Sequence, residues 1–237
     1  MTLRALRDLG ALNPTSEVLG VGAGAEATLF WLTNHVRRVV ATDLYDDEWG
    51  EQAPKEMLSN PGRFASCPWN PDRLVVERMD ALDLRYDDSS FDGVFSSSSI
   101  EHFGDHDDVR RALAEIRRVL KPGGIAALST EYRIDGDLPQ LPGILLFDEA
   151  ELHSVLASKD WEFVEPLDLT ISEATLDGTL NFDEAAADLA AGREWSRYPH
   201  VVLRHDLGAT WTSVHVVLRA RRSRIGRLFF ARRWRAT

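Results

Sequence analysis

The sequence has little cysteine and no long apolar run, and each absence excludes a class of protein. Cys67 is the only cysteine, which excludes an internal disulfide and a metal site built from clustered cysteines. No apolar stretch approaches the roughly 18 residues that a membrane-spanning helix needs. The first ten residues alternate leucine with charged residues, so they lack the apolar centre of a signal peptide. We therefore expect a cytoplasmic protein.

Basic residues are in the minority, since 27 lysines and arginines face 38 acidic residues and the net charge is −11. A general nucleic-acid binder needs a basic surface to meet phosphates, so that class is disfavoured. Residues 219–237 nevertheless hold eight arginines and no acid, interleaved with Leu228, Phe229, Phe230 and Trp234, so the rest carries −19. We expect this basic tail to dock on the acidic body of its own chain or of a second subunit in a homodimer. Peripheral contact with an anionic membrane is the alternative.

Short apolar runs alternate with segments of helical spacing along the chain. The runs that predict strands lie at 17–21, 37–43, 74–80, 91–99, 125–131, 163–171 and 210–221. Helices are expected between them, at 3–12, 25–34, 109–120, 148–158 and 181–195. This alternation predicts an α/β fold with a mostly parallel sheet that is covered on both faces. Ligands bind such sheets outside the carboxyl ends of the strands, where this sequence places polar residues.

The turn after the first strand, G-V-G-A-G-A-E-A at residues 20–27, permits two interpretations. From Gly22 it approximates the G-x-G-x-x-G/A loop that seats the pyrophosphate of a dinucleotide. From Gly20 it is a glycine turn of the kind that holds S-adenosylmethionine, with two usual residues missing. In both interpretations Gly22 and Gly24 let the backbone approach a ligand, and the next helix offers N–H groups to a carboxylate. The turn alone does not decide between them.

Two later segments carry a family resemblance. They read M-D-A-L-D-L-R-Y-D-D-S-S-F-D-G-V-F-S-S-S-S-I-E-H-F at 79–103 and L-A-E-I-R-R-V-L-K-P-G-G-I-A-A-L-S-T-E at 113–131. Together with the glycine turn they resemble the class I S-adenosylmethionine-dependent methyltransferases over roughly residues 15–135. The resemblance implies a Rossmann-like, seven-stranded, mostly parallel sheet with helices on both faces and an antiparallel last strand.

The resemblance also implies a domain organisation. The methyltransferase domain would cover residues 1–221 and the basic tail residues 222–237. Inserts on the acceptor side are expected near 45–72, 132–147 and 172–210.

S-adenosylmethionine is the cofactor that the resemblance implies, with S-adenosylhomocysteine as its product. Asp43 matches the acid that holds the ribose hydroxyls, and Asp80 and Ala81 match the positions that bracket the adenine. The complete predicted cofactor set is Gly22, Ala23, Gly24, Glu26, Asp43, Leu44, Asp80, Ala81, Ser97 and Ser98. A plain helix cap is the alternative role for Asp43 and for Asp80.

Two positions of the turn depart from the family pattern. Gly20 stands where an acid is usual, and Glu26 stands where a third glycine is usual. We expect Glu26 to cap the following helix, because a carboxylate is stabilised near a helix N-terminus. Contact with the substrate or with the amino group of the cofactor is the alternative.

The dinucleotide interpretation explains Gly22–Ala27 and Asp43 but nothing after residue 80. It also requires a second half for the nicotinamide, and the later chain shows no such repeat. We therefore predict a methyltransferase. An NAD(P)-dependent Rossmann oxidoreductase and a non-catalytic S-adenosylmethionine-binding module are the alternatives.

Methyl transfer to an alcohol requires positioning of the acceptor and removal of its proton. His102 is the predicted general base, and Glu101 beside it is predicted to orient the ring or to accept a proton itself. Packing at a helix start is the alternative role for His102. Asp105, His106 and Glu131 are secondary candidates, and with Glu101 and His102 they could instead hold Mg²⁺. Their spacing matches no specific metal motif, so a metal ion is possible but not predicted.

The acceptor is inferred from the inserts. No Asn-Pro-Pro-Tyr follows the fourth strand, where base-modifying enzymes place it, so nucleic acid is disfavoured. The aromatic residues singled out in or near the inserts are Trp49, Trp69, Tyr132, Trp195, Tyr198 and Trp211. Aromatic faces near acids suit a sugar, although packing of the inserts onto the core is the alternative for each residue. The whole sequence is similar to sugar O-methyltransferases of actinobacterial polysaccharide pathways, which implies a small saccharide acceptor.

Overall fold

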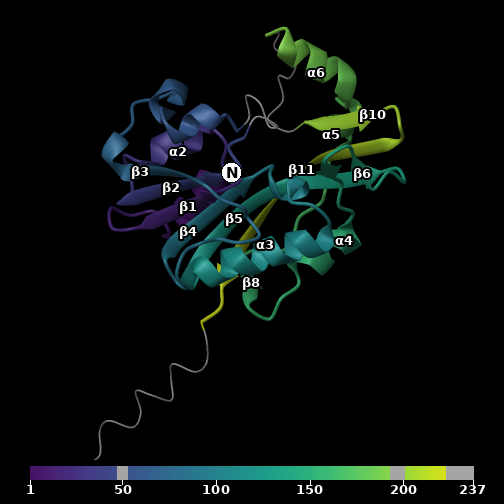
Figure 1. Cartoon of the computed structure of the whole chain (residues 1–237). Helices are drawn as coiled ribbons and strands as arrows, with labels where there is room; N and C mark the ends of the chain where they lie inside the picture. Colours follow the sequence, from purple (N-terminus) through teal and green to yellow (C-terminus); the bar gives the residue numbers. More distant parts are fainter. Residues whose placement is uncertain (47–52, 193–200, 223–237) are drawn as a thin grey trace, which may run out of the picture.

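One large sheet organises the computed structural model, which describes residues 1–46, 53–192 and 201–222 (Figure 1). The predicted tail and the predicted aromatic positions Trp49, Trp195 and Tyr198 lie outside these residues, apart from the first residues of the tail. In the described part of the chain the strands run in the order β3-β2-β1-β4-β5-β11-β10-β9, and β8 also pairs with β11. The strands that follow the predicted pattern are β1 (Glu17–Val21), β2 (Arg38–Asp43), β3 (Leu74–Arg78), β4 (Phe91–Ser97), β5 (Leu120–Asp135), β8 (Trp161–Phe163) and β11 (Ala209–Ala220).

The pairing directions confirm the predicted sheet. Strands β3, β2, β1, β4 and β5 are parallel, whereas β11 is antiparallel to both β5 and β8 and lies between them. This arrangement differs from the dinucleotide-binding sheet, whose parallel strands run in the order 3-2-1-4-5-6. The sheet therefore disfavours the oxidoreductase alternative. Strand order reverses between β1 and β4, so a crevice is expected where these two strands end.

Two short strands extend the predicted seven. They are β9 (Leu180–Asn181) and β10 (Val202–His205), and β10 pairs with the first residues of β11. A separate hairpin is formed by β6 (Gln140–Leu141) and β7 (Ile144–Leu145). These pieces come from two of the predicted inserts, which therefore contain regular structure.

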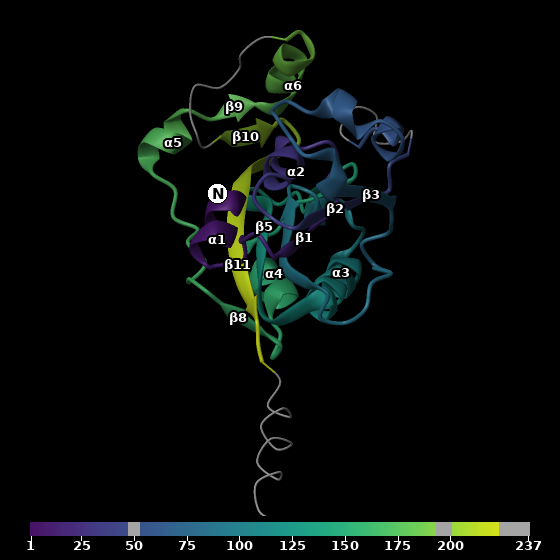
Figure 2. The ribbon, with the colours of Figure 1, turned by 90° about the vertical axis from the view of Figure 1, so that its left-hand side faces the viewer.

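Helices cover both faces of the sheet, as predicted (Figures 1 and 2). The helices are α1 (Thr2–Asp8), α2 (Ala27–Leu32), α3 (His106–Val119), α4 (Glu149–Leu156), α5 (Glu173–Asp177) and α6 (Phe182–Ala190). One core cluster packs α1 and α2 against the sheet, and a second packs α3 and α4 against the other face. Among the described residues, no helix is long and apolar enough to cross a bilayer.

Helix α3 shows how local sequence fixes an element that borders the crevice. Asp105 is its N-cap, and its side chain accepts hydrogen bonds from the backbone N–H groups of Asp107 and Asp108. The Asp108 side chain accepts the N–H of Asp105 in return, which completes a capping box. Val109, Leu113, Ile116 and Val119 are buried on one face of the helix. The capping role of Asp105 accounts for a residue that the sequence suggested as a secondary catalytic or metal-binding candidate.

Several predicted boundaries are wrong by a few residues. The predicted strand at 125–131 begins earlier, because β5 starts at Leu120 and includes the K-P-G-G segment at 121–124. The strand predicted at 163–171 is wrong over most of its length, because β8 runs from Trp161 to Phe163 and shares only Phe163 with it. The predicted insert at 45–72 contains the short 3₁₀ helices η1 (Lys55–Leu58) and η2 (Pro61–Phe64), and η3 (Pro71–Arg73) follows at its end.

Candidate active site

A cavity of about 810 Å³ lies at the carboxyl ends of the parallel strands. This volume is within the range of roughly 300–1,000 Å³ typical of small-molecule sites. Its wall contains all the predicted cofactor and catalytic residues: Gly22, Ala23, Gly24, Glu26, Asp43, Leu44, Asp80, Ala81, Ser97, Ser98, Glu101 and His102. The structure thus brings together residues that are up to 80 positions apart, although their individual roles stay predictions.

The glycine turn is shaped by close packing against β4 and the residues that follow it. Gly22 has a φ of +60°, and a Cβ atom there would lie 2.6 Å from the Cβ of Ser99. A Cβ at Gly20 would lie 2.8 Å from both the Cβ of Ala23 and the ring of Phe95. The crowding at position 20 gives a physical reason for the missing acid, because the backbone there lies directly against a core phenylalanine.

Three hydrogen bonds hold the glycine turn against neighbouring elements. The N–H of Gly24 donates to Oδ2 of Asp43 at 2.9 Å, and the Ser99 hydroxyl donates to the carbonyl of Gly22 at 2.6 Å. Beneath the turn, the buried Tyr45 hydroxyl donates to the carbonyl of Gly24 at 3.0 Å. Burial raises the pKa of Tyr45, so the phenol keeps the proton that makes this bond. These contacts preorganise the turn before any ligand binds.

Asp43 ends β2 with its carboxylate in the cavity wall. Besides Gly24, its carboxylate accepts a hydrogen bond from the N–H of Leu44 at 2.7 Å. Burial raises the pKa of Asp43, and the bonds from the backbone N–H groups oppose that rise. Each carboxylate oxygen can accept more than one hydrogen bond, so Asp43 can hold the turn and still meet a hydroxyl in the cavity.

Glu26 occupies the N-cap position of α2, but its side chain makes no capping hydrogen bond, so the predicted capping role is wrong. The side chain lines the cavity instead. Burial, with a smaller contribution from the charge of Asp43, raises the pKa of Glu26 to about 7. Hydrogen bonds from the side chains of Ser97 and Thr28 oppose that rise. A carboxyl group poised near neutrality in a cavity wall fits the alternative role of ligand contact.

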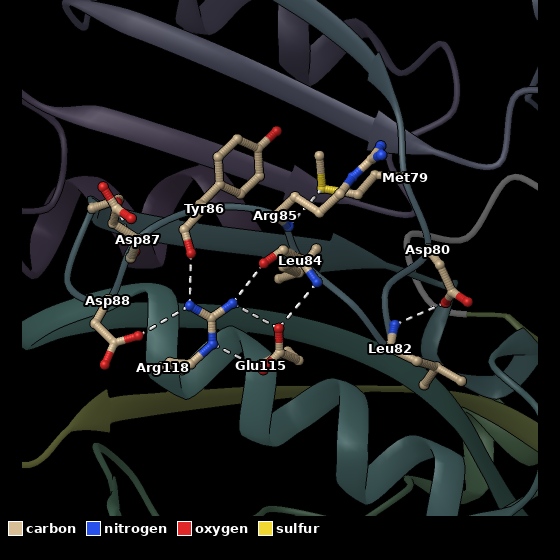
Figure 3. Close-up of polar contacts among 11 residues, drawn as sticks. Met79, Asp80, Leu82, Leu84, Arg85, Tyr86, Asp87, Asp88, Glu115 and Arg118 are labelled. Atoms are coloured by element: carbon tan, nitrogen blue, oxygen red, sulfur yellow. Dashed lines mark hydrogen bonds and ion pairs between the residues drawn. The ribbon is translucent and has the colours of Figure 1, made fainter.

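The loop after β3 is held in place from helix α3 (Figure 3). The side chain of Asp80 bonds to the backbone two residues further on, where its Oδ1 accepts the N–H of Leu82 at 2.8 Å. The guanidinium of Arg118 then donates to the carbonyls of Leu84 and Tyr86. Glu115 pairs with Arg118 at 2.7 Å and accepts the N–H of Leu84 at 3.0 Å. The Arg118 and Glu115 contacts therefore anchor the later part of the loop that begins with Asp80, and no short motif marks them.

The predicted catalytic pair lies in η4 (Ile100–His102), directly after β4. Nδ1 of His102 lies 2.6 Å from the carbonyl oxygen of Gly143, in the turn of the β6–β7 hairpin. Glu101 is only 2% exposed, and its Oε2 accepts the hydroxyl of Thr130 at 2.9 Å. Burial, and secondarily the Glu131 carboxylate, raises the pKa of Glu101 to about 8. A raised pKa favours the protonated form of Glu101 near neutral pH, which disfavours the predicted role as a proton acceptor.

Glu131 lies across from this pair on β5. Its Oε1 accepts the hydroxyl of Ser213 at 3.0 Å, and burial raises its pKa. His106 is turned elsewhere, 3.7 Å from the carboxylate of Glu151 and stacked edge-on against Phe147. Within the described ranges, no group of three or more histidine, cysteine or acidic side chains is arranged to hold a metal ion.

The remaining wall is largely apolar and comes from the inserts and β11. Its residues are Ile144, Phe182, Val201, Leu203, Trp211, Thr212 and Ser213. Trp211 is the one predicted insert aromatic that the described structure places in this wall. Trp69 instead packs edge-on against Phe30 in the core, and Tyr132 packs against the cluster on the α3 face. The packing alternative is therefore correct for these two aromatics.

The sequence did not single out several wall residues. Ser99, Met79 and Phe103 adjoin predicted residues and could have been found by extending each segment. Thr212 and Ser213 were missed because ligand-binding residues were expected at the carboxyl ends of strands, and these two residues lie near the beginning of one. The antiparallel β11 instead brings its beginning to that edge of the sheet. Gly143 was missed because its contribution is a backbone carbonyl.

The cavity fits the cofactor that the fold implies. Its wall combines a rigid glycine turn with five acidic side chains, namely Glu26, Asp43, Asp80, Glu101 and Glu131. Such a wall suits a ligand with a ribose diol and cationic groups, because carboxyl oxygens accept hydrogen bonds from hydroxyls and those acids that are ionised attract sulfonium and ammonium groups. The chemistry of these side chains and the position of the cavity at the strand ends both fit S-adenosylmethionine.

Comparison with known proteins shows what part of the chain is similar to methyltransferases. Residues 19–128 match the family described as methyltransferase domain. The O-methyltransferase resE of Aspergillus sclerotiorum is 37% identical over 151 residues, which are 62% of this chain and 53% of resE. The S-adenosyl-L-methionine-dependent Diels-Alderase iccD of Talaromyces variabilis is 34% identical over 119 residues, which are 50% of this chain and 37% of iccD. The chain spans about half the length, or less, of these relatives.

Solved structures share the fold. The [4+2]-cyclase SpnF superposes with a TM-score of 0.61 at 16% identity, covering 94% of this chain and 80% of SpnF. The N-methyltransferase NodS of Bradyrhizobium japonicum, solved with S-adenosylhomocysteine, gives a TM-score of 0.55 at 16% identity and covers 92% of this chain and 83% of NodS. The chain therefore shares the Rossmann-like fold of these structures, and its residues 19–128 match a methyltransferase domain.

Proposed function

We propose that the protein is an S-adenosylmethionine-dependent O-methyltransferase that acts on a small hydroxylated acceptor, with His102 as general base. The observation that carries this proposal is the hydrogen bond between Nδ1 of His102 and the Gly143 carbonyl. A carbonyl oxygen only accepts, so Nδ1 carries the proton and Nε2 is the basic nitrogen of the neutral ring. His102 lies in the wall of the same cavity as the glycine turn and Asp43.

The residues divide the cavity into two parts. On one side the glycine turn, Asp43 and the Asp80–Leu82 loop would hold the cofactor, which supplies an electrophilic methyl group on a sulfonium. On the other side Trp211 and the insert residues would hold the acceptor. His102 takes the proton from the acceptor hydroxyl as the new carbon–oxygen bond forms and the carbon–sulfur bond breaks. The products are a methyl ether, S-adenosylhomocysteine and a proton that His102 passes to water.

A sugar or oligosaccharide is the acceptor class that we propose. Sugar rings present an apolar face and a rim of hydroxyls, and the acceptor wall combines Trp211 and Leu203 with Glu131 and Ser213. The Glu131 carboxylate retains acceptor positions beyond the one that Ser213 fills. The names of several relatives support oxygen as the methylated atom, since resE is an O-methyltransferase and a rifamycin-modifying relative from Amycolatopsis mediterranei methylates a 27-O position.

The first experiment measures cofactor binding and is followed by an activity screen. Thermal unfolding is recorded with S-adenosylhomocysteine and separately with NAD and NADH. A ligand at about 100 times its Kd adds about 2.7 kcal/mol to stability. We expect a shift with S-adenosylhomocysteine only, and a shift with a nicotinamide nucleotide only would overturn the proposal. Simple sugars, methyl glycosides, oligosaccharides and phenols are then screened by mass spectrometry for gain of a methyl group.

The variant His102→Ala tests the base. It should keep the thermal shift with S-adenosylhomocysteine and lose turnover by about 10²–10⁴-fold, the usual contribution of a general base. His153→Ala is the matched control, because His153 is an exposed histidine on α4 outside the cavity. Full turnover in His102→Ala would refute the assigned role.

A cyclase that uses the cofactor without consuming it is the second candidate. The apolar wall of Ile144, Phe182, Leu203 and Trp211 favours it, together with the likeness to iccD and SpnF. The same screen separates the two functions, because a cyclase changes its substrate without releasing S-adenosylhomocysteine. A non-catalytic binding module would bind the cofactor and transform no substrate.

A further inference from the structure

The β6–β7 hairpin contacts the predicted base through one backbone atom. The carbonyl oxygen of Gly143 lies 2.6 Å from Nδ1 of His102, across 41 positions of sequence. A neutral imidazole has one N–H, and the partner of one nitrogen decides where that proton resides. A carbonyl at Nδ1 selects the Nδ1–H tautomer, which leaves Nε2 as the nitrogen that can take a proton.

The hairpin turn depends on glycine for its conformation alone. Pro142 and Gly143 are its two central residues, and Gly143 has a φ of +76°. Proline followed by a residue of positive φ is the requirement of a type II turn. A Cβ at Gly143 would meet no atom within 4 Å, so the first atom of a side chain has open space there. A substitution at this position therefore acts first through the backbone preference for φ.

The hairpin is anchored to the acceptor wall. Leu141 is 4% exposed and Leu146, just after β7, is 1% exposed, and both belong to the small core cluster that contains Trp211. The N–H of Leu146 also donates to the carbonyl of Pro139 at 2.9 Å, which closes the base of the hairpin. Ile144 lines the main cavity and also a smaller cavity of about 340 Å³ between the hairpin and His102. The turn that meets His102 is thus fixed to the residues that would contact an acceptor.

We propose that the hairpin of residues 140–145 is a positioning element, in which the Gly143 carbonyl sets the tautomer and direction of His102. This inference rests on the proposed role of His102 as general base. The hairpin assigns the proton of the neutral ring to Nδ1 and so keeps Nε2 competent to deprotonate the acceptor hydroxyl. The same hairpin carries Ile144, which lines the cavity, and Leu141, which packs in the cluster that contains Trp211. One hairpin therefore contributes to the acceptor wall and also sets the tautomer of His102.

The experiment alters the turn and reads the histidine directly. Gly143→Val disfavours a positive φ most strongly, whereas Gly143→Asn tolerates it and is the conservative variant. Gly10→Val is the matched control, since Gly10 has a φ of +79°, equally open surroundings and no place in the cavity wall. The tautomer of His102 is measured by ¹⁵N NMR of labelled imidazoles at pH 9, with His102→Ala identifying the signal. Gly143→Ala replaces the valine variant if the latter does not fold.

We expect the wild type, Gly143→Asn and Gly10→Val to show the Nδ1–H form. Gly143→Val should shift the ring toward the Nε2–H form and lower kcat by at least about tenfold, a part of what general-base catalysis provides. A wild type with the proton on Nε2, or a Gly143→Val variant with an unchanged tautomer, would overturn the inference. The NMR result needs no substrate, so it stands apart from the proposed function, which fails instead if His102→Ala keeps full turnover.

Discussion

Replacing Arg118 by alanine should destabilise the protein through the loop that carries Asp80. The guanidinium makes five hydrogen bonds, two to Glu115, one to Asp88, and one each to the carbonyls of Leu84 and Tyr86. They connect α3 to the segment between β3 and β4 (Figure 3). In Arg118→Ala the two carbonyls and the Glu115 carboxylate lose their shared donor.

The size of the effect follows from exposure. The Arg118 side chain is 31% exposed, so water can replace part of what is lost, and the Asp88 partner, 77% exposed, contributes little. A hydrogen bond to a charged group is worth about 1.5–3 kcal/mol when well formed. Because water replaces part of these hydrogen bonds, the free energy of unfolding should fall by about 3 kcal/mol in Arg118→Ala. For a chain of this length each kcal/mol lowers the Tm by about 2–4 °C, so a decrease of about 6–12 °C is expected.

The assay is thermal unfolding with Arg111→Ala as the control. Arg111 lies on the same helix, but it is 65% exposed and has a single ion pair with Asp108 at 3.4 Å, so its loss should cost less than about 1 kcal/mol. Arg118→Ala should also weaken S-adenosylhomocysteine binding more than the control, because the freed loop carries Asp80 and Leu82. A Tm within about 2 °C of the control would refute the assigned role of the network.

The pH dependence provides an independent check. The hydrogen bond from Arg118 holds the pKa of Glu115 below its usual value. A depressed carboxyl pKa contributes stability above the unfolded-state pKa, and that stability is lost as pH falls through the folded-state pKa. The Tm difference between wild type and Arg118→Ala should therefore be full at neutral pH and shrink on acidification. A difference that grows on acidification would contradict this linkage.

Three further substitutions test the cavity wall. Gly22→Ala should cost about 1–3 kcal/mol and weaken S-adenosylhomocysteine binding, because its Cβ would meet Ser99 at 2.6 Å at a φ of +60°; Gly10→Ala, with open surroundings, is the control in thermal unfolding. Asp43→Asn should keep the fold and weaken S-adenosylhomocysteine binding, measured by calorimetry, at least about tenfold, since its single amide oxygen can accept from only one of the N–H groups of Gly24 and Leu44 and carries no charge. Glu101→Gln should flatten the pH dependence of stability. The pKa of Glu101 is higher in the folded protein, at about 8, than in the unfolded chain. The free energy of unfolding of the wild type should therefore fall by about 3–5 kcal/mol as pH rises from the unfolded-state pKa toward about 8. Denaturant unfolding at pH 5 and pH 8 that gives both proteins the same change would contradict this assignment.

The cofactor side of the cavity was predictable because it is built from consecutive local patterns. The first strand was predicted at 17–21 and is found at Glu17–Val21, since an apolar run followed by a glycine turn fixes both the element and its end. Asp43 and Ser97 terminate β2 and β4, and parallel strands bring their carboxyl ends to one edge. The predicted strand ends together with the family resemblance were sufficient to collect these residues.

The acceptor side and the supporting contacts were not predictable in the same way. The β6–β7 hairpin has two residues in each strand, which is too short for a period-2 pattern to show. Gly143 acts through its carbonyl, and Arg118 reaches carbonyls about 32 positions away with a long side chain. Glu26 was expected to cap its helix, but its side chain makes no capping hydrogen bond and instead lines the cavity near Asp43. Each of these features depends on tertiary packing.

The antiparallel strand β11 also has a consequence for the order of folding. By residue 135 a growing chain contains β1 to β5, and with them the glycine turn, Asp43 and His102. The opposite wall needs β11, which ends at Ala220, and synthesis at about 5–20 residues per second takes roughly 4–17 s to add the intervening residues. During that interval the edge of β5 has no partner strand, and unpaired edges favour association between chains. A nascent chain stalled in this window should therefore depend on chaperones more than the finished protein does.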